Sequence, residues 1–167
     1  MKLIVNVDNQ WNIGNDGDLV FPIPEDMKFF RTTTSGKVVV MGRKTLDSFP
    51  GGNPLKNRVN IVLTRDTSFE REPSVICNSV DDVLEKIKEY NTDDVYIIGG
   101  AEIYKTFLDY CDTALVTHVD AVAQKADKKF PDLSQYPEWK LVEQSEIKES
   151  NGFEFRFCTY KKDVGVL

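Results

Sequence analysis

Short and wholly apolar segments recur along this chain, and they alternate with segments whose apolar residues follow a helical spacing. Short apolar runs predict strands buried on both faces, and their alternation with helices predicts a mostly parallel α/β sheet. We expect strands at residues 3–7, 37–41, 59–63, 75–77, 95–98 and 115–119, and helices at 25–33, 43–48, 79–90 and 101–108. In such sheets ligands bind beyond the carboxyl ends of the strands, so we expect the chemistry just after each parallel strand.

The C-terminal segments at residues 139–146 and 153–160 flank a Ser-Asn-Gly sequence at residues 150–152, which is typical of a tight turn. We expect these segments to form an antiparallel hairpin that adds edge strands to the sheet, with three phenylalanines on one face. The expected architecture is therefore a central, mostly parallel sheet of eight strands with about four flanking helices. At 167 residues, the chain is expected to form one domain, residues 1–167.

Composition argues against several classes of function. The net charge of −6 argues against a surface that binds nucleic acid or acidic membranes. The cysteines, Cys77, Cys111 and Cys158, are odd in number and are not spaced as metal or redox pairs, which is typical of reduced thiols in a cytoplasmic protein. His118 is the one histidine, so the chain has too few histidines to favour a zinc site or a histidine-based triad. No apolar run approaches about 18 residues, and the first residues turn polar too soon for a signal peptide.

Basic residues are concentrated between residues 28 and 65. Eight lysines and arginines stand against one acid there, Asp47, so this stretch carries +7 and the rest of the −6 chain carries −13. An acidic protein with one basic stretch suits a bound anionic small molecule. The same pattern also arises from a solvated surface whose charges pair with acidic helices elsewhere. The sequence leaves both interpretations open.

Two expected strands run directly into glycine and then into a helix, at Gly42-Arg43-Lys44-Thr45 and at Gly99-Gly100-Ala101-Glu102. Free amides and the positive end of the helix dipole favour a phosphate at such a turn, and glycine lets the phosphate approach the backbone. Neither turn matches the P-loop or the dinucleotide fingerprint, and glycine at a strand–helix turn is often a matter of geometry alone. Two such turns in one small domain suit a ligand with two or more phosphates, and Thr64-Arg65 offers a third anion site.

Asp26 lies at the start of the first expected helix, which Pro24 opens. Asp26 and Phe30 are four residues apart and therefore share one helical face. An ionised carboxylate offers only acceptors, so this pair suits a polar heterocycle that presents adjacent ring N–H and amino donors. Alternatively, Asp26 only complements the helix dipole, as the solvated Glu25 would. The helix terminus and ligand donors lower the pKa of Asp26 while burial raises it, and the sequence does not decide which effect prevails.

Several of these motifs occur in one order over roughly residues 1 to 160. They are Leu3-Ile4-Val5, Ile13-Gly14, Pro24-Glu25-Asp26 with Phe30, Met41-Gly42-Arg43-Lys44-Thr45, Asn57-Arg58-Val59-Asn60-Ile61-Val62-Leu63-Thr64, Ile98-Gly99-Gly100-Ala101-Glu102-Ile103-Tyr104 and Thr117-His118-Val119-Asp120. In this combination the chain resembles the dihydrofolate reductase family. The resemblance implies NADPH-dependent reduction of 7,8-dihydrofolate to tetrahydrofolate, with hydride to C6 and a proton to N5. We expect a cytoplasmic monomer without metal that serves one-carbon and thymidylate metabolism and binds antifolates.

The resemblance implies a pterin pocket in which Asp26 is the sole ionisable group and supports protonation of N5, through water or directly. Thr117 would steady the carboxylate, and Arg58 would clamp the glutamate carboxylate of the folate tail as a bidentate fork. The implied substrate residues are Ile4, Val5, Asp26, Met27, Phe30, Phe49, Leu55, Arg58, Ile98, Tyr104 and Thr117.

The resemblance also implies that NADPH lies across both glycine turns, with Thr64 and Arg65 at its 2′-phosphate and Asn6 contributing mostly its backbone. The implied cofactor residues are Asn6, Ile13, Gly14, Asn15, Gly17, Asp18, Leu19, Gly42, Arg43, Lys44, Thr45, Leu63, Thr64, Arg65, Asn78, Gly99, Gly100, Ala101, Glu102, Ile103 and Tyr104. In the family a cis peptide joins the two glycines of the second turn. The polar loop at residues 8–23 would close as a lid that excludes water, with Trp11 partly exposed in it.

The sequence departs from the family's commonest pattern at Val20-Phe21, where many members have Pro-Trp, and at Asn6, where alanine is common. Phe21 lacks the indole N–H that often holds a water near the acid. These differences bear on the lid and the proton route rather than on the reaction. Two alternatives stay open: a catalytically silent folate- or nucleotide-binding module on this fold, and a related reductase acting on a pteridine or a riboflavin precursor. Arg58 distinguishes reduction of dihydrofolate from the last alternative, because only a substrate with a carboxylate tail needs this arginine.

Overall fold

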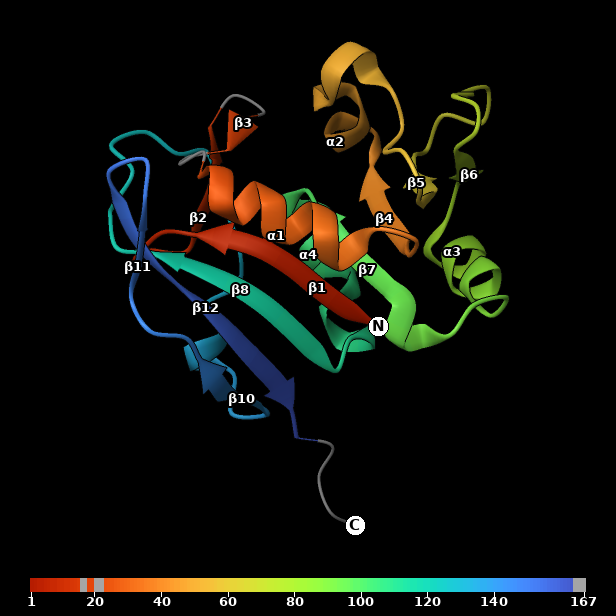
Figure 1. Cartoon of the computed structure of the whole chain (residues 1–167). Helices are drawn as coiled ribbons and strands as arrows, with labels where there is room; N and C mark the ends of the chain where they lie inside the picture. Colours follow the sequence, from red (N-terminus) through yellow and green to blue (C-terminus); the bar gives the residue numbers. More distant parts are fainter. Residues whose placement is uncertain (16–17, 20–22, 164–167) are drawn as a thin grey trace.

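The computed structural model describes residues 1–15, 18–19 and 23–163 of the chain. Its largest element is a nine-stranded sheet in the order β10-β12-β8-β1-β7-β4-β5-β6, with β11 paired to β12 outside this path (Figure 1). The strands are β1 (Lys2–Val7), β4 (Val38–Gly42), β5 (Val59–Leu63), β6 (Val75–Cys77), β7 (Val95–Gly99), β8 (Thr113–Val119), β10 (Trp139–Gln144), β11 (Lys148–Ser150) and β12 (Phe153–Lys162). Neighbours from β8 to β6 pair in parallel, and β12 is antiparallel to β8, β10 and β11. The predicted mostly parallel sheet is confirmed.

The described residues form four α-helices and four short 3₁₀ turns. These are α1 (Pro24–Thr34), α2 (Arg43–Ser48), α3 (Val80–Ile87), α4 (Ala101–Phe107), η1 (Pro50–Gly52), η2 (Thr92–Asp94), η3 (Leu108–Tyr110) and η4 (Leu133–Gln135). Proline stands in the first turn of α1, and the hydroxyl of Ser79 caps α3 by accepting from the N–H of Asp82. All four predicted helices are confirmed, although α3 ends at Ile87 rather than at residue 90. None of the helices in the described part of the chain has the length and apolar character needed to cross a membrane.

Helices cover both faces of the sheet because its central strands are apolar on both sides. Along β4, Val38 and Val40 belong to one apolar cluster, whereas Val39 and Met41 belong to another. Helices α3 and α4 contribute to the first cluster, and α1 and α2 contribute to the second. Figure 1 shows α1 in front of the sheet with α4 behind it. Residues on the α1 side of β1, β7 and β8 are therefore the ones that can meet side chains of α1.

The C-terminal hairpin is confirmed around Asn151 and Gly152, whose φ angles of 53° and 80° suit a tight turn. Its predicted first strand, residues 139–146, is shorter in the structure, because β10 ends at Gln144, and a separate strand, β11, forms beyond the predicted range. The register of β10 on β12 shifts between Leu141 and Glu143, and such an irregularity bends a strand. The hairpin adds only one edge strand to the main path, because β12 lies between β10 and β8.

Residues 8–23, predicted to be a loop, contain two short strands. β2 (Asn12–Asn15) and β3 (Asp18–Leu19) join β9 (Lys128–Lys129) in a second, three-stranded sheet. Asp8 anchors the start of this segment, since its carboxylate accepts from the backbone N–H groups of Gln10, Asn12 and Ala123. Burial raises the pKa of Asp8, but these hydrogen bonds and one from the Asn12 side chain outweigh burial and lower it.

The expectation that Trp11 is partly exposed is wrong. Its side chain is buried, and its ring packs edge-on against His118 at 4.8 Å and stacks on Phe130 at 6.0 Å. The backbone of Trp11 also accepts from the N–H of Phe130. The part of the predicted lid around Trp11 is therefore packed into the core.

Asn60 on β5 is buried and ties the preceding loop to the sheet. Its side chain accepts from the N–H of Leu55 and donates to the carbonyls of Leu55 and Arg58. We expect Asn60→Ala to lower the free energy of unfolding by about 1–3 kcal/mol, because buried backbone groups lose their partners. Urea unfolding measures the change, with Asn53→Ala at an exposed position of the same loop as the control. Equal losses in the two variants would contradict this role.

Candidate active site

A carboxylate from a helix meets two polar side chains from the centre of the sheet. Asp26 stands in the first turn of α1. The hydroxyl of Thr117 donates to its Oδ1 at 2.6 Å, and the side-chain amide of Asn6 donates to its Oδ2 at 2.9 Å. Asn6 and Thr117 are register partners on the parallel strands β1 and β8, so their side chains leave the same face of the sheet. The carboxylate is thus held at both oxygens, which favours the pocket interpretation over the helix-dipole one.

The surroundings of Asp26 change how readily it binds a proton. Burial raises the pKa of Asp26, and the hydrogen bonds from Thr117 and Asn6 lower it without cancelling the effect of burial. Among the groups of the protein itself, the effect of burial on the pKa of Asp26 therefore prevails. His118, beside Thr117 on β8, points to the opposite face as predicted, where its ring meets Trp11. It is not available to this carboxylate as an acid.

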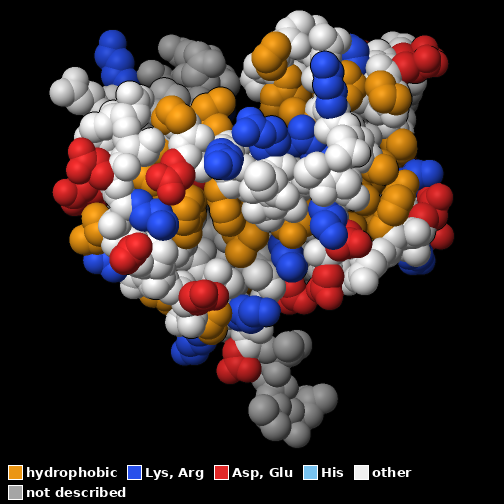
Figure 2. Space-filling view, viewed as in Figure 1, with side chains coloured by type: hydrophobic (Ala, Val, Ile, Leu, Met, Phe, Trp, Pro, Cys, Tyr) orange, Lys and Arg blue, Asp and Glu red, His pale blue; other side chains and the backbone are white. Residues whose placement is uncertain are grey.

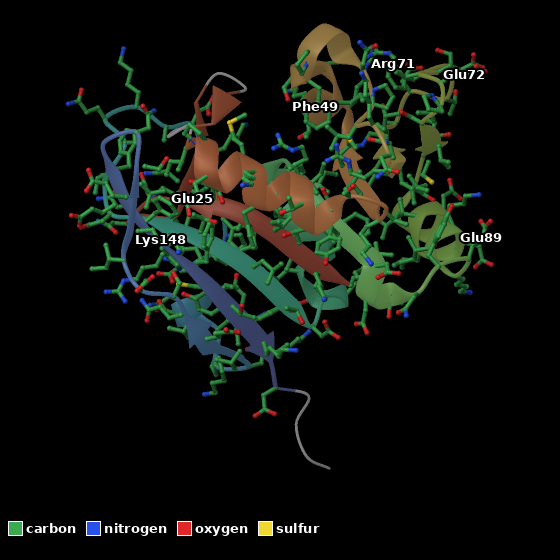
Figure 3. All side chains as sticks on the ribbon, in the orientation of Figure 1. Glu25, Phe49, Arg71, Glu72, Glu89 and Lys148 are labelled. Atoms are coloured by element: carbon green, nitrogen blue, oxygen red, sulfur yellow. The ribbon has the colours of Figure 1, made fainter. Side chains whose placement is uncertain are left out.

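Apolar side chains from several elements form a wall on the same side of the sheet as Asp26. Five predicted substrate residues lie together in the cluster covered by α1 and α2: Ile4, Phe30, Phe49, Leu55 and Ile98. Figure 3 shows Phe49 just beyond α2, across from the first turn of α1, which carries the exposed Glu25. Strands, helices and a loop therefore converge on one apolar surface.

Three predicted substrate residues lie apart from this wall. The side chain of Val5 belongs to the cluster on the opposite face, because neighbours in a strand alternate. Met27 is 54% exposed on α1. Tyr104 is buried, and its hydroxyl lies 2.7 Å from the carbonyl oxygen of Ile4 and 2.8 Å from that of Ile98. Burial raises the pKa of Tyr104, so the hydroxyl stays a donor and supports the backbone beneath two wall residues.

Arg58 lies beside the C-terminal half of α1 and is partly buried. Its Nε donates to the carbonyl of Lys56 at 2.9 Å, and its Nη1 donates to the hydroxyl of Thr34 at 3.1 Å. Thr34 in turn donates to the carbonyl of Phe30 within α1. Burial lowers the pKa of Arg58 and the charge of Arg31 lowers it further, although a guanidinium stays charged at neutral pH. Two neighbouring positive charges favour an anion at this place.

The basic stretch divides into residues that pair with acids and residues that do not. Lys37 pairs with Asp94 at 3.0 Å, and Arg43 pairs with Asp66 at 3.2 Å and with Asp47 at 3.7 Å, as expected of a surface that pairs with acids. Within the described ranges, no ion pair involves the remaining basic residues, Lys28, Arg31, Lys44, Lys56, Arg58 and Arg65. Figure 2 shows Lys and Arg side chains gathered over α1 and toward α2, where the outline of the surface is notched.

The two glycine turns lie side by side because β4 and β7 are neighbouring parallel strands. A Cβ on Gly42 would lie 3.1 Å from Ile103 of α4, and a Cβ on Gly100 would lie 3.7 Å from the hydroxyl of Thr45 on α2. Gly99 has a φ of +124°, and a Cβ there would lie 3.2 Å from the ring of the underlying tyrosine, so a side chain would be strained. The peptide between Gly99 and Gly100 is cis, as the resemblance implies. The amide-bearing starts of α2 and α4 therefore share one surface.

The other predicted cofactor residues follow the ends of the same strands. Arg43 and Lys44 lie in the first turn of α2, and Ala101 and Glu102 lie in that of α4. Leu63 ends β5, and Thr64 and the exposed Arg65 follow it. Asn78, after β6, donates its side-chain amide to the carbonyl of Thr64 at 2.8 Å. Asn78 therefore holds the loop that carries Arg65.

The predicted lid residues are only partly described. Ile13 and Gly14 lie in β2, and the backbones of Asn15, Asp18 and Leu19 belong to β2 and β3. Gly17 and Val20-Phe21-Pro22 lie outside the described residues.

The sequence predicts mostly a backbone role for Asn6, whereas in the structure its side chain also donates to Asp26. Alternation along β1 places Asn6 on the same face as Ile4, which was the available signal. Its partner, however, depends on where α1 crosses the strands, and that crossing is set by packing between elements far apart in the sequence.

We expect Asp26→Asn to raise the melting temperature at pH 7, because it removes a buried charge. An asparagine there can accept from Asn6 and donate to the oxygen of Thr117, so no polar atom loses its partner. Because the pKa of Asp26 is raised in the folded protein, the wild-type carboxyl lowers stability as the pH rises above the ordinary value of 3.8. The difference between variant and wild type should therefore shrink as the pH falls, in thermal unfolding followed by circular dichroism. A variant that melts lower than wild type at pH 7 would contradict this account.

Comparison with known proteins agrees with the geometry. A family model described as dihydrofolate reductase matches residues 1–162. Dihydrofolate reductase from Bacillus subtilis (strain 168) is 34% identical over 164 residues, which cover 97% of this chain and 94% of that protein. Dihydrofolate reductase from Haemophilus influenzae is 34% identical over 147 residues, which cover 87% of this chain and 88% of that protein.

A solved structure has the same fold. Dihydrofolate reductase from Enterococcus faecalis, complexed with NADP(H) and RAB-propyl, superposes with a TM-score of 0.84 at 30% identity, covering 97% of this chain and 95% of that one. The likeness in sequence and in fold extends over nearly the whole length of both proteins. This chain belongs to the dihydrofolate reductase family.

Proposed function

We propose that this chain catalyses the NADPH-dependent reduction of 7,8-dihydrofolate to 5,6,7,8-tetrahydrofolate, with hydride to C6 and a proton to N5. The observation that carries the proposal is the Asp26 carboxylate, which Thr117 and Asn6 hold at both oxygens. Family membership over residues 1–162, taken as a single domain, supports it. The product would supply one-carbon and thymidylate metabolism.

The arrangement around Asp26 suits the pterin ring. A carboxylate has about four lone-pair positions, and the two sheet residues use one on each oxygen. One acceptor therefore remains on each oxygen for the adjacent ring N–H and amino groups of the pterin. At the other end of α1, Arg58 keeps further N–H donors for the carboxylate of the folate tail. The apolar wall between them would contact the aminobenzoyl group.

The residues present also fit NADPH, which supplies the hydride when bound. Gly42 and Gly99 leave out side chains that would press on Ile103 and Tyr104, so α4 can pack closely against both turns. The starts of α2 and α4 suit phosphate groups, and Arg43 and Lys44 add positive charge. Thr64 and Arg65 would bind the 2′-phosphate, which would favour NADPH over NADH.

Asp26 has two tasks in this proposal. It orients the ring by accepting from the ring N–H and amino groups, and its raised pKa lets it bind a proton closer to neutral pH than an ordinary aspartate does. Asp26 would then support the transfer of a proton to N5, either through water or directly. The apolar wall keeps bulk water away from the carbon that receives hydride.

We expect the purified protein to oxidise NADPH only when dihydrofolate is present, measured as the loss of NADPH absorbance. Asp26→Asn should lower kcat at pH 7 by about 100- to 10,000-fold, the contribution typical of a positioned acid–base group, while NADPH affinity is kept. Glu25→Gln, at the exposed neighbouring position, is the matched control and should keep wild-type turnover. An active Asp26→Asn would refute the assigned role. A wild-type protein that binds folate without turnover would indicate a silent binding module, and turnover of a tail-less heterocycle alone would indicate the related reductase.

We expect Arg65→Ala to raise KM for NADPH by about 10- to 100-fold, the loss of one or two charge-assisted hydrogen bonds. KM for NADH should change little, because NADH lacks the 2′-phosphate. Lys88→Ala serves as the control. It removes another exposed cation, which follows α3 directly and pairs with Glu85 of that helix. Equal losses for both cofactors would exclude the 2′-phosphate contact.

We further propose a cytoplasmic monomer that binds antifolates and has no nucleic-acid or membrane partner. The three cysteines are free and buried, and burial raises the pKa of Cys111 to about 12, so its thiol stays protonated and unreactive. Among the described residues, no group of three or more His, Cys, Asp or Glu residues could hold a metal ion. Light scattering coupled to gel filtration should give 19.0 kDa, and twice that mass would refute the monomer.

A further inference from the structure

The side chain of Asn6 has a partner that the proposed reaction does not by itself require. Its amide nitrogen lies 2.9 Å from Oδ2 of Asp26, while the Thr117 hydroxyl lies 2.6 Å from Oδ1. The two donors are register partners on β1 and β8, which are inner strands of the nine-stranded sheet. Each carboxylate oxygen therefore receives one hydrogen bond from a rigid strand.

Two donors fix a carboxylate more completely than one donor does. A carboxylate held at a single oxygen can still rotate about its Cβ–Cγ bond, because that torsion is broad. A second donor on the other oxygen removes this freedom. The free lone pairs of Asp26 are then held in one orientation, which adjacent donors on a planar ring need.

Asparagine can also stay bonded when Asp26 gains or loses a proton. Its terminal amide carries a donor and an acceptor, and a half-turn of the amide exchanges them. Ionised Asp26 accepts from the amide nitrogen, and protonated Asp26 can donate to the amide oxygen. The Thr117 hydroxyl can likewise donate or accept, so neither protonation state leaves a buried polar atom without a partner.

We propose that Asn6 is a positioning residue for the reaction, which fixes the Asp26 carboxylate and keeps it hydrogen-bonded in both of its protonation states. This inference rests on the proposed reductase function. It is distinct from a packing role, because aspartate has nearly the same shape as asparagine but cannot donate when ionised.

Among the described residues, few other charges act on Asp26. From α4, the titratable group that interacts with it is Tyr104, which stays neutral because burial raises its pKa. On its own helix, Glu25 is exposed, and on β8 His118 packs on the opposite face of the sheet. Removal of the Asn6 donor should therefore show directly as a rise in the pKa of Asp26, which that donor lowers.

The experiment compares wild type, Asn6→Ala and Asn6→Asp. Carbon-13 NMR of the Asp26 carboxyl, titrated in the ligand-free full-length protein, should give a pKa that rises from wild type to Ala and again to Asp. Alanine removes a donor, and aspartate adds a like charge as well. The pH profile of kcat/KM for dihydrofolate should shift in the same direction, and kcat/KM at pH 7 should fall about tenfold in Asn6→Ala, as for one charge-assisted hydrogen bond.

The outcomes separate a hydrogen-bonding role from a packing role. If Asn6 only packs, the Asp26 pKa in Asn6→Ala stays at the wild-type value, and that result overturns the inference. Asn91→Ala is the matched control. The Asn91 side chain accepts from the N–H of Asp93 just before the start of β7, whereas the glycine turn follows the end of that strand. Wild type without turnover would overturn the proposed function alone, since the NMR titration still decides the role of Asn6. If Asn6→Ala does not fold, Asn6→Leu decides it by the same pKa comparison, because leucine has nearly the size of asparagine but no donor.

Discussion

The carboxylate of Asp26 joins helix α1 to the centre of the sheet, because it accepts one hydrogen bond from each of two inner strands. Thr117 and Asn6 stand opposite each other only in the observed register of β1 and β8. That register is fixed by apolar neighbours on both faces, since a shift by one residue would turn every side chain of β1 to the other face. The charge is held in place by strands that are themselves held by the core. Because burial raises the pKa of Asp26, the ionised form lowers stability at neutral pH, as expected of a group retained for chemistry.

One buried side chain links this carboxylate site to the glycine turns. The hydroxyl of Tyr104 lies within hydrogen-bond distance of the carbonyls of Ile4 and Ile98, and its ring lies beneath Gly99. The wall beside Asp26 and the second glycine turn therefore rest on the same residue. Since β1, β7 and β4 are neighbours in the sheet, a substrate at Asp26 and a cofactor on the turns would be adjacent. Adjacency of this kind is what hydride transfer between two bound molecules requires.

The sequence was most informative where a local pattern determines the structure. The apolar strands, the proline at the start of α1 and the glycine turns are local signals, and each predicted element is present. The errors concern long-range packing. Trp11 is buried because Phe130 and His118, more than 100 residues away, cover it. The role of the Asn6 side chain was missed because its partner comes from a different element. The basic stretch was ambiguous because pairing with Asp94 and Asp66 depends on how distant loops fold.

Helix α1 also sets the distance between the two polar ends of the proposed substrate site. Asp26 lies in its first turn, and Thr34, which accepts from Arg58, lies at its end. Eight residues of α-helix span about 12 Å, so the helix keeps the acid about that far from the residue that accepts from the arginine. A ring bound at the acid and a carboxylate bound at the arginine must then belong to an elongated molecule. In the proposed function, selectivity for a heterocycle with an anionic tail would therefore follow from the length of one helix as much as from the two charged groups.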